Sequence, residues 1–140
     1  MVTVHNTHPT ERISTTAIRR LVNTLVRRET SSAFEISIVL CDRERHTELH
    51  RTFLDRDYPT DVLAFPLGDS ETLEGEVYVD LDTARNRHEE FMCSFESEVA
   101  RYVVHGVLHL LGFDDKTTES RSAMKKKEEK YVSLFEDHDY

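Results

Sequence analysis

The chain has 140 residues and a net charge of -9, with 38% hydrophobic and 32% charged residues. This length can bury one core and is too short for two ordinary domains, so we expect a single domain over residues 1–140. No apolar run approaches the ~20 residues of a membrane span, which argues against a membrane protein. The acidic balance also argues against a protein whose whole surface attracts nucleic acid.

The charge is unevenly distributed along the chain. Residues 1–58 contain nine arginines, no lysine and eight acidic residues, for a net charge of +1, whereas residues 59–140 carry -10. The N-terminal part can therefore present a local basic face on an acidic protein. The N-terminus lacks the basic start and apolar stretch of a signal peptide, so we expect a cytoplasmic location.

Hydrophobic periodicity predicts four strands and five helices. The strands are expected at residues 2–4, 34–40, 60–65 and 76–81, with the third ending at Pro66. The helices are expected to begin after Ser14, Asp42, Asp82 and Ser94, and at Glu119. The charged run 125–130 in the last helix is interpreted as a solvated face. These elements predict an α+β fold with a small mixed four-stranded sheet covered by about five helices.

The helix after Ser94 carries two histidines, His105 and His109, on one face. At about 100° per residue, Glu98 and Tyr102 share that face, and apolar residues cover more than half of the circumference. The pattern indicates a helix buried in the centre of the fold. Two imidazoles on a buried helix need polar partners, because an unpaired buried polar group costs a few kcal/mol.

The residues after this helix complete a pattern typical of a metal site. Gly112 favours the left-handed turn that ends a helix, which can bring Asp114 or Asp115 back to the histidines. Three protein ligands leave one position of a tetrahedral ion open for water, as in catalytic zinc sites. The alternative is a pair of hydrogen-bonded core histidines beside a capped helix end.

The same segment resembles the signature of the YbeY family, single-domain metal-dependent endoribonucleases of ribosomal RNA maturation. The family pattern HGxLHLxGYDH, which supplies three histidine ligands, is similar to HGVLHLLGFDD at residues 105–115. The resemblance includes Asp57-Tyr58-Pro59-Thr60-Asp61-Val62-Leu63-Ala64-Phe65-Pro66, similar to the family's D-x-P-T-D-V-L-S-F-P. It continues through residues 75–79 to Met124 and Glu128, and so covers roughly residue 34 to the C-terminus.

Two positions differ from the family pattern. The third histidine aligns with Asp115, so the resemblance implies His105, His109 and Asp115 as ligands of one Zn²⁺, with Mn²⁺ or another divalent ion as an alternative. The arginine that often follows the aromatic residue of the family's L-N-x-x-Y-R segment is replaced by Leu54. Arg51 or Arg56 can take over RNA phosphate binding in its place.

The resemblance implies a metal-dependent, single-strand-specific endoribonuclease that acts in ribosomal RNA processing through a metal-bound water. Its partners would be ribosomal RNA and pre-ribosomal particles, with no DNA and no membrane, and its oligomeric state is left open. One alternative is a ribosome-associated RNA-binding factor with a structural ion. Another is a metallopeptidase, which is disfavoured because Gly106 stands where the zincin helix has its glutamate.

Overall fold

The computed structural model describes residues 1–54, 62–67 and 72–140, and the side chains of residues 50–54 and 62–67 lie outside that description. Five helices and four strands occur in the described part of the chain. Their order is β1 (Val2–Asn6), α1 (Thr15–Glu29), β2 (Ala33–Cys41), α2 (Arg43–Leu54), β3 (Val62–Leu67), β4 (Thr72–Asp80), α3 (Leu81–Arg87), α4 (Phe95–Leu110) and α5 (Thr118–Glu136).

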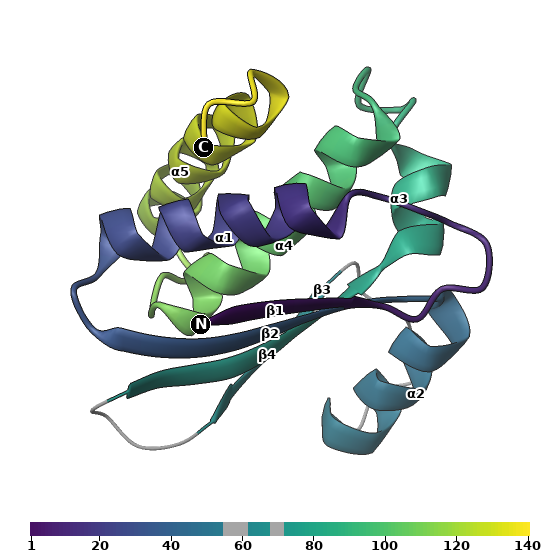
Figure 1. The fold of residues 1–140 in the computed structure, drawn as a ribbon, viewed down its shortest axis with the longest axis horizontal. Helices are drawn as coiled ribbons and strands as arrows, with labels where there is room; N and C mark the ends of the chain where they lie inside the picture. The colour runs from purple at the N-terminus through teal and green to yellow at the C-terminus, as the bar shows by residue number, and fades with distance from the viewer. Residues whose placement is uncertain (55–61, 68–71) are drawn as a thin grey trace.

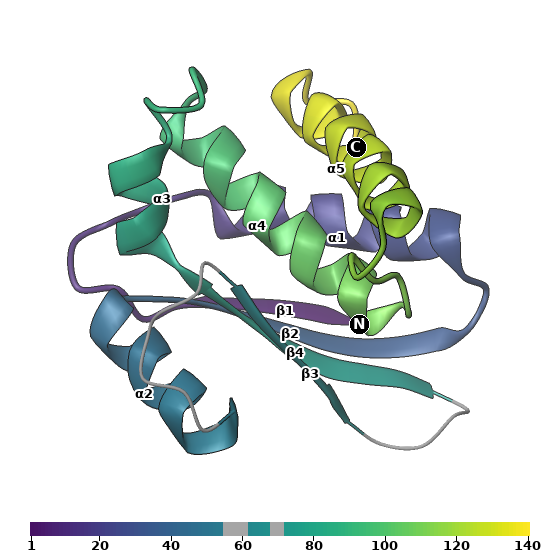
Figure 2. The same cartoon turned by 180° about the vertical axis from the view of Figure 1, so that it is seen from behind.

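The strands form one mixed sheet in the order β1-β2-β4-β3. β1, β2 and β4 run parallel, and β3 pairs antiparallel with β4 at the sheet edge. Helices α1, α4 and α5 lie over one face of the sheet, and α2 lies against the other (Figure 1). The view from behind shows the same layers, with α4 between the sheet and α5 (Figure 2).

α4 lies at the centre of the packing, in contact with α1, α3, α5, β3 and β4. Its apolar residues are buried, and Val103, Val107 and Leu108 have no exposed surface. They meet the fully buried stripe that α1 contributes through residues such as Ile18 and Leu25. Burial of an aliphatic side chain contributes roughly 1.5–3 kcal/mol, so this contact fixes the position of α4 over the sheet. No helix in the described ranges has the length and apolar content needed to cross a membrane.

The predicted helix caps at Ser14, Asp42 and Ser94 are confirmed. The Ser14 hydroxyl accepts a hydrogen bond from the Ala17 backbone at 3.1 Å, and Ser94 accepts one from Ser97 at 3.0 Å. The Asp42 carboxylate accepts the Arg45 backbone N–H at 2.8 Å. Each contact satisfies a backbone donor that the first helical turn leaves without a partner.

Several predicted boundaries are wrong. β1 continues two residues past its predicted end, to Asn6. β3 continues through Pro66 to Leu67, which an edge strand tolerates because one of its sides carries no ladder hydrogen bonds. β4 begins at Thr72, four residues earlier than predicted, since pairing with both β2 and β3 extends it through a polar stretch. The cap of α3 is Asp80, whose carboxylate accepts the Thr83 N–H at 3.0 Å, so Leu81 opens this helix.

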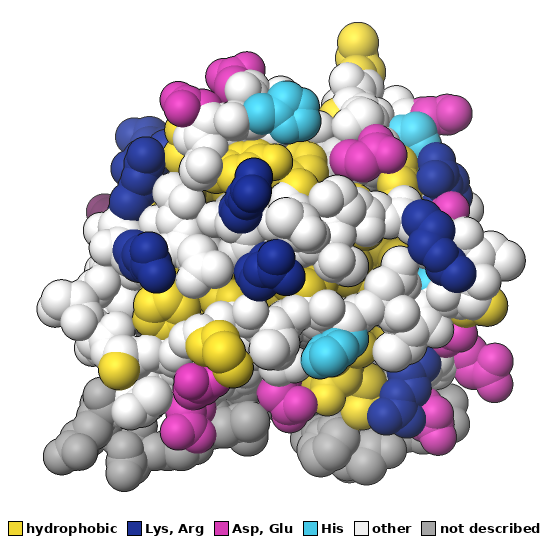
Figure 3. Space-filling model, viewed as in Figure 1, with side chains coloured by type: hydrophobic (Ala, Val, Ile, Leu, Met, Phe, Trp, Pro, Cys, Tyr) yellow, Lys and Arg dark blue, Asp and Glu magenta, His cyan; other side chains and the backbone are white. Residues whose placement is uncertain are grey.

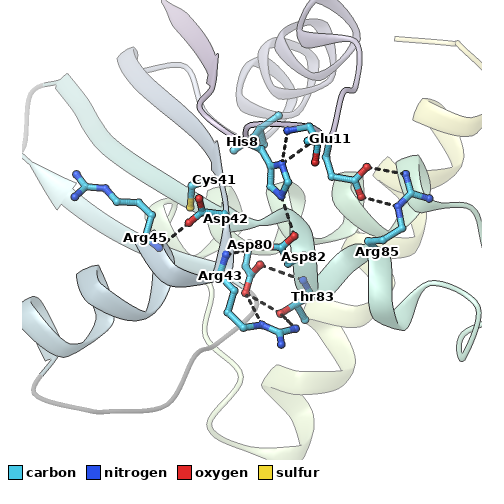
Figure 4. A network of polar contacts seen from close by, with 12 residues as sticks. His8, Glu11, Cys41, Asp42, Arg43, Arg45, Asp80, Asp82, Thr83 and Arg85 are labelled. Carbon is cyan, nitrogen blue, oxygen red and sulfur yellow. Dashed lines mark hydrogen bonds and ion pairs between the residues drawn. The ribbon is translucent and has the colours of Figure 1, made fainter.

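Asp82, predicted as that cap, instead joins a polar network near the start of α3 (Figure 4). Its carboxylate contacts His8 Nε2 at 2.8 Å and accepts the Arg43 backbone N–H at 2.9 Å. His8 is buried, and its Nδ1 accepts the backbone N–H groups of Thr10 and Glu11. Because Nδ1 is the acceptor, Nε2 carries the proton and donates it to Asp82. This network ties the segment between β1 and α1 to α3.

Candidate metal centre

The two histidines lie on the last turns of α4, where the chain reverses. Gly112 has a φ of 98°, in the left-handed region that glycine adopts without strain. The Gly112 N–H donates to the His109 carbonyl at 3.0 Å, and the Phe113 N–H donates to the Leu108 carbonyl at 3.0 Å. These two bonds form a Schellman motif, so the predicted turn is confirmed. The turn directs the following acidic residues back along α4.

Three donor atoms converge at this reversal. The Nε2 atoms of His105 and His109 lie 2.9 Å apart, and Asp115 Oδ2 lies 3.7 Å from the first and 4.0 Å from the second. Ligand bonds of ~2.0–2.2 Å in tetrahedral geometry separate neighbouring donors by roughly 3.3–3.5 Å. The observed distances bracket that value. The three residues are half-buried, so the cluster has the composition and size for one divalent ion.

Glu128 of α5 orients the first histidine. Its Oε2 lies 2.8 Å from His105 Nδ1, and the Glu128 side chain is only 13% exposed. A carboxylate only accepts, so Nδ1 donates the proton and the lone pair of Nε2 is directed at the gap between the donors. A carboxylate that fixes a ligating imidazole in this way is a recurrent support of metal sites. Arg101 contacts the other Glu128 oxygen at 3.9 Å.

The ionisation of His109 favours the form that binds metals. Burial is the main cause that lowers its pKa below the usual value, and the neighbouring His105 lowers it further. Asp115 and a hydrogen bond to the Phe113 backbone act in the opposite direction. Since Nε2 faces His105, Nδ1 is the nitrogen available to Phe113. His109 is thus held neutral near pH 7 with its Nε2 facing the cluster, and a neutral imidazole is the ligating form.

The structure separates the two aspartates that the sequence left as alternatives. Asp114 is exposed and points into the loop before α5, where its Oδ1 accepts the Lys116 N–H at 3.2 Å. A hydrogen bond from Ser120 is the main cause that lowers the pKa of Asp114. Asp115, by contrast, contacts both histidines. The geometry therefore favours Asp115 as the third donor.

A cavity of about 560 Å³ adjoins the cluster, between α4 and α5. One wall is the polar face of α4 that the helical wheel predicts, with Glu98, Tyr102 and His105. Asp115 and Glu128 complete the end that contains the cluster. Two of the three donor residues, His105 and Asp115, thus line a recess large enough for a substrate group.

The two predicted phosphate-binding arginines are not tested by the structure. Arg51 belongs to α2, on the face of the sheet opposite α4 (Figure 2), and its side chain lies outside the described residues. Arg56 also lies outside them. The predicted local basic face is present on α1. Figure 3 shows basic side chains over this helix, and its exposed arginines are Arg19, Arg20, Arg27 and Arg28.

Glu128 is named in the family resemblance, but its contact with a histidine of the site is not predicted from the sequence. The run 125–130 was interpreted as a solvated face, which is wrong for two of its members. Glu128 contacts His105, and Lys127 contacts Glu29 Oε1 at 2.8 Å. The available signal was spacing, because Glu128 follows the buried Met124 by four residues and precedes the buried Tyr131 by three. A single acid on an apolar stripe predicts a buried partner.

Comparisons with known proteins all point to one family. A family model described as "Endoribonuclease YbeY" matches residues 3–136. A curated "Endoribonuclease YbeY" from Salinibacter ruber is 40% identical over 94% of this chain and 90% of its own length. One from Chloroherpeton thalassium is 36% identical over 87% and 86%. The solution structure of TM1509 from Thermotoga maritima matches with a TM-score of 0.66 and 29% identity, over 96% of this chain and 89% of that one.

Proposed function

The chain belongs to the YbeY family, and we propose that it is a metal-dependent, single-strand-specific endoribonuclease that acts on ribosomal RNA during ribosome maturation. The observation that carries the metal dependence is the cluster of His105, His109 and Asp115. Its ligand atoms all lie within 4.8 Å of one another beside an open cavity. The relatives named as endoribonucleases support RNA as the substrate.

The residues fit a divalent ion in both charge and tautomer. Two neutral imidazoles and one carboxylate suit Zn²⁺, and the carboxylate makes the site more hospitable to a harder ion such as Mn²⁺. A bound ion would polarise a phosphoryl oxygen and lower the pKa of a water molecule, which are the two demands of phosphodiester hydrolysis. We propose Zn²⁺ as the ion, held by His105, His109 and Asp115.

The protein's own side chains prepare the site for this chemistry. Glu128 holds the proton on His105 Nδ1 and so keeps Nε2 directed at the cluster. The burial that lowers the His109 pKa prevents this ring from carrying a proton near pH 7. Asp115 adds the negative charge that offsets part of the ion's charge. The orientation of His105 and the lowered pKa of His109 therefore both favour metal binding.

Arg51 and Arg56 remain our proposed contacts to RNA phosphates. The proposal also includes one domain over residues 1–140, pre-ribosomal particles as partners and a cytoplasmic location. A double variant with both arginines changed to Ala should weaken RNA binding without loss of bound metal. Unchanged affinity of this variant would remove the two arginines from the proposal.

The central experiment combines metal analysis with a cleavage assay. The purified protein should contain close to one equivalent of a divalent ion and should cut single-stranded ribosomal RNA fragments. A chelator should abolish cleavage, and so should His109→Ala. Asp115→Ala should cause the same loss, whereas the matched change Asp114→Ala should leave cleavage intact. Full activity of the chelated protein would refute the proposal.

The same experiment separates the two other functions. Loss of thermal stability on chelation, without RNA turnover under any condition, would indicate an RNA-binding factor with a structural ion. Cleavage of casein would indicate a metallopeptidase. Gly106 is buried on α4 and offers no carboxylate next to His105, so we expect no casein cleavage.

A further inference from the structure

The cavity beside the metal centre extends well beyond the three donor atoms. Arg87 and Phe91, which precede the N-terminus of α4, line it together with Asp115, which follows the C-terminus of that helix. The cavity therefore runs along α4. Its volume of about 560 Å³ falls within the ~300–1,000 Å³ typical of small-molecule sites. The metal centre explains one end of this cavity. The function of the other end, beside Phe91, has still to be explained.

Phe91 exposes an aromatic ring in the wall of this cavity. It is 52% exposed, although large apolar side chains are normally buried. Three hydrogen bonds hold the turn that presents it. The Cys93 N–H donates to the His88 carbonyl at 3.1 Å, the Met92 N–H donates to the Glu89 carbonyl at 3.0 Å, and His88 Nδ1 lies 2.9 Å from the Cys93 carbonyl. The guanidinium of Arg87 lies 5.0 Å from the centre of the Phe91 ring. Phe91 is thus held in place while much of its surface is open.

Cationic side chains line the cavity from three elements. They are Arg87 of α3, Arg101 of α4, and Arg121 and Lys125 of α5. Four carboxylates also line the cavity. Two of them already have partners, because Asp115 belongs to the donor cluster and Glu128 contacts His105. The lining is therefore neutral by formal charge, and a divalent ion in the cluster would make it positive. An anionic chain that reaches the ion would find cations on both sides of the cavity.

We propose that this cavity is a nucleotide-binding subsite, in which Phe91 stacks on an unpaired base and Arg101 and Arg121 hold the phosphates of the same RNA strand. The inference rests on the proposed nuclease function and deepens it. Stacking on an aromatic ring requires a base that is free of its duplex neighbours, so the subsite selects single-stranded RNA. Arginine suits the second task because its planar guanidinium pairs with phosphate oxygens.

The test compares RNA binding by the full-length, metal-loaded protein and its variants. A fluorescein-labelled single-stranded RNA hexamer is followed by stopped-flow anisotropy, read before cleavage products appear on a gel. The Phe91→Ala variant should bind this hexamer on the order of tenfold more weakly than the parent protein. The Phe91→Tyr variant, which keeps an aromatic ring, should bind it with the parental affinity. Met92→Ala is the matched control, since Met92 is 93% exposed and does not line the cavity. Binding of an RNA duplex should be equal for all four proteins.

Arg121→Ala tests the phosphate contact independently. It should reduce the slope of log affinity against log salt by about 0.7. The control Lys126→Ala, which removes an exposed cation outside the cavity lining, should change this slope less.

Parental affinity for the hexamer in both Phe91→Ala and Arg121→Ala would overturn the subsite, and would leave the cavity to another kind of partner. If those variants bound like the parent but still cut RNA in a metal-dependent way, the nuclease function would stand without the subsite. Weaker hexamer binding by both variants, together with a parent protein that binds the hexamer but cuts no RNA, would support the subsite and refute the nuclease function.

Discussion

Replacing Glu128 by Gln should weaken metal binding although Glu128 is not a proposed ligand. The substitution keeps the shape of the side chain and removes the charge that faces His105 Nδ1 at 2.8 Å. A hydrogen bond to a charged group contributes about 1.5–3 kcal/mol, and this one is largely shielded from water because Glu128 is only 13% exposed. Loss of such a carboxylate support typically lowers metal affinity about 10- to 100-fold. We expect a loss in that range, with a parallel loss of RNA cleavage at limiting metal.

The measurement is a competition between the protein and a chromophoric chelator for Zn²⁺. Glu129→Gln is the matched control, because Glu129 lines the same cavity and is exposed but makes no contact with a histidine in the described part of the chain. Excess metal should restore cleavage by Glu128→Gln, which distinguishes weak binding from a failure to fold. Equal Zn²⁺ affinities for Glu128→Gln and Glu129→Gln would refute the orienting role.

Three further changes test the site and the fold. Asp115→His removes a negative charge from the cluster and should shift the pH–rate profile to lower pH, because the ion then acidifies its water more strongly; identical profiles would contradict this. Burial lowers the pKa of His109, so below about pH 6.5 the unfolded chain binds a proton more readily than the folded one. The free energy of unfolding of the metal-free protein in urea should therefore decrease as the pH falls below about 6.5. The His109→Gln variant should show a weaker dependence of this free energy on pH. An unchanged dependence in the variant would exclude His109 as the cause. His8→Ala removes one of the two partners of the Asp82 carboxylate and the acceptor of two backbone N–H groups, so it should cost about 2–3 kcal/mol in urea unfolding. The control His5→Ala, at an exposed position, should cost less than ~0.5 kcal/mol.

Histidine positions illustrate how local patterns can mislead. His46 lies among charged residues such as Glu44, Arg45 and Glu48, a local pattern that is typical of a surface position. It is instead fully buried, with Nε2 3.2 Å from the Tyr78 carbonyl on β4. The contact joins residues 32 positions apart, so no local window of sequence contains it. Burial of a polar side chain follows from the partner that it meets, and that partner is set by the packing of α2 against β4.

The start of β4 and the cap of α3 also depend on contacts with distant residues, which the local sequence does not reveal. Alternation predicts the apolar half of β4 from Glu76 onward, but its start at Thr72 follows from pairing with β2 and β3. The side-chain pattern cannot reveal a ladder formed by backbone groups of distant strands. Likewise, Asp80 and Asp82 are equivalent as caps by sequence. Asp80 caps α3 and Asp82 contacts His8, because β1 and α1 bring His8 to that position.

The sequence by itself determined most of what lies within one turn or one helix. The spacing of His105 and His109 places both rings on one face, Gly112 permits the reversal, and the resemblance to the family pattern indicates Asp115 as their companion; the distances agree with each step. Only the tertiary structure brings α5 against α4, because Glu128 and His105 lie 23 positions apart in the sequence. That contact fixes the tautomer of the first histidine. It also creates the cavity between the two helices, since a cavity wall depends on how side chains from separate elements meet.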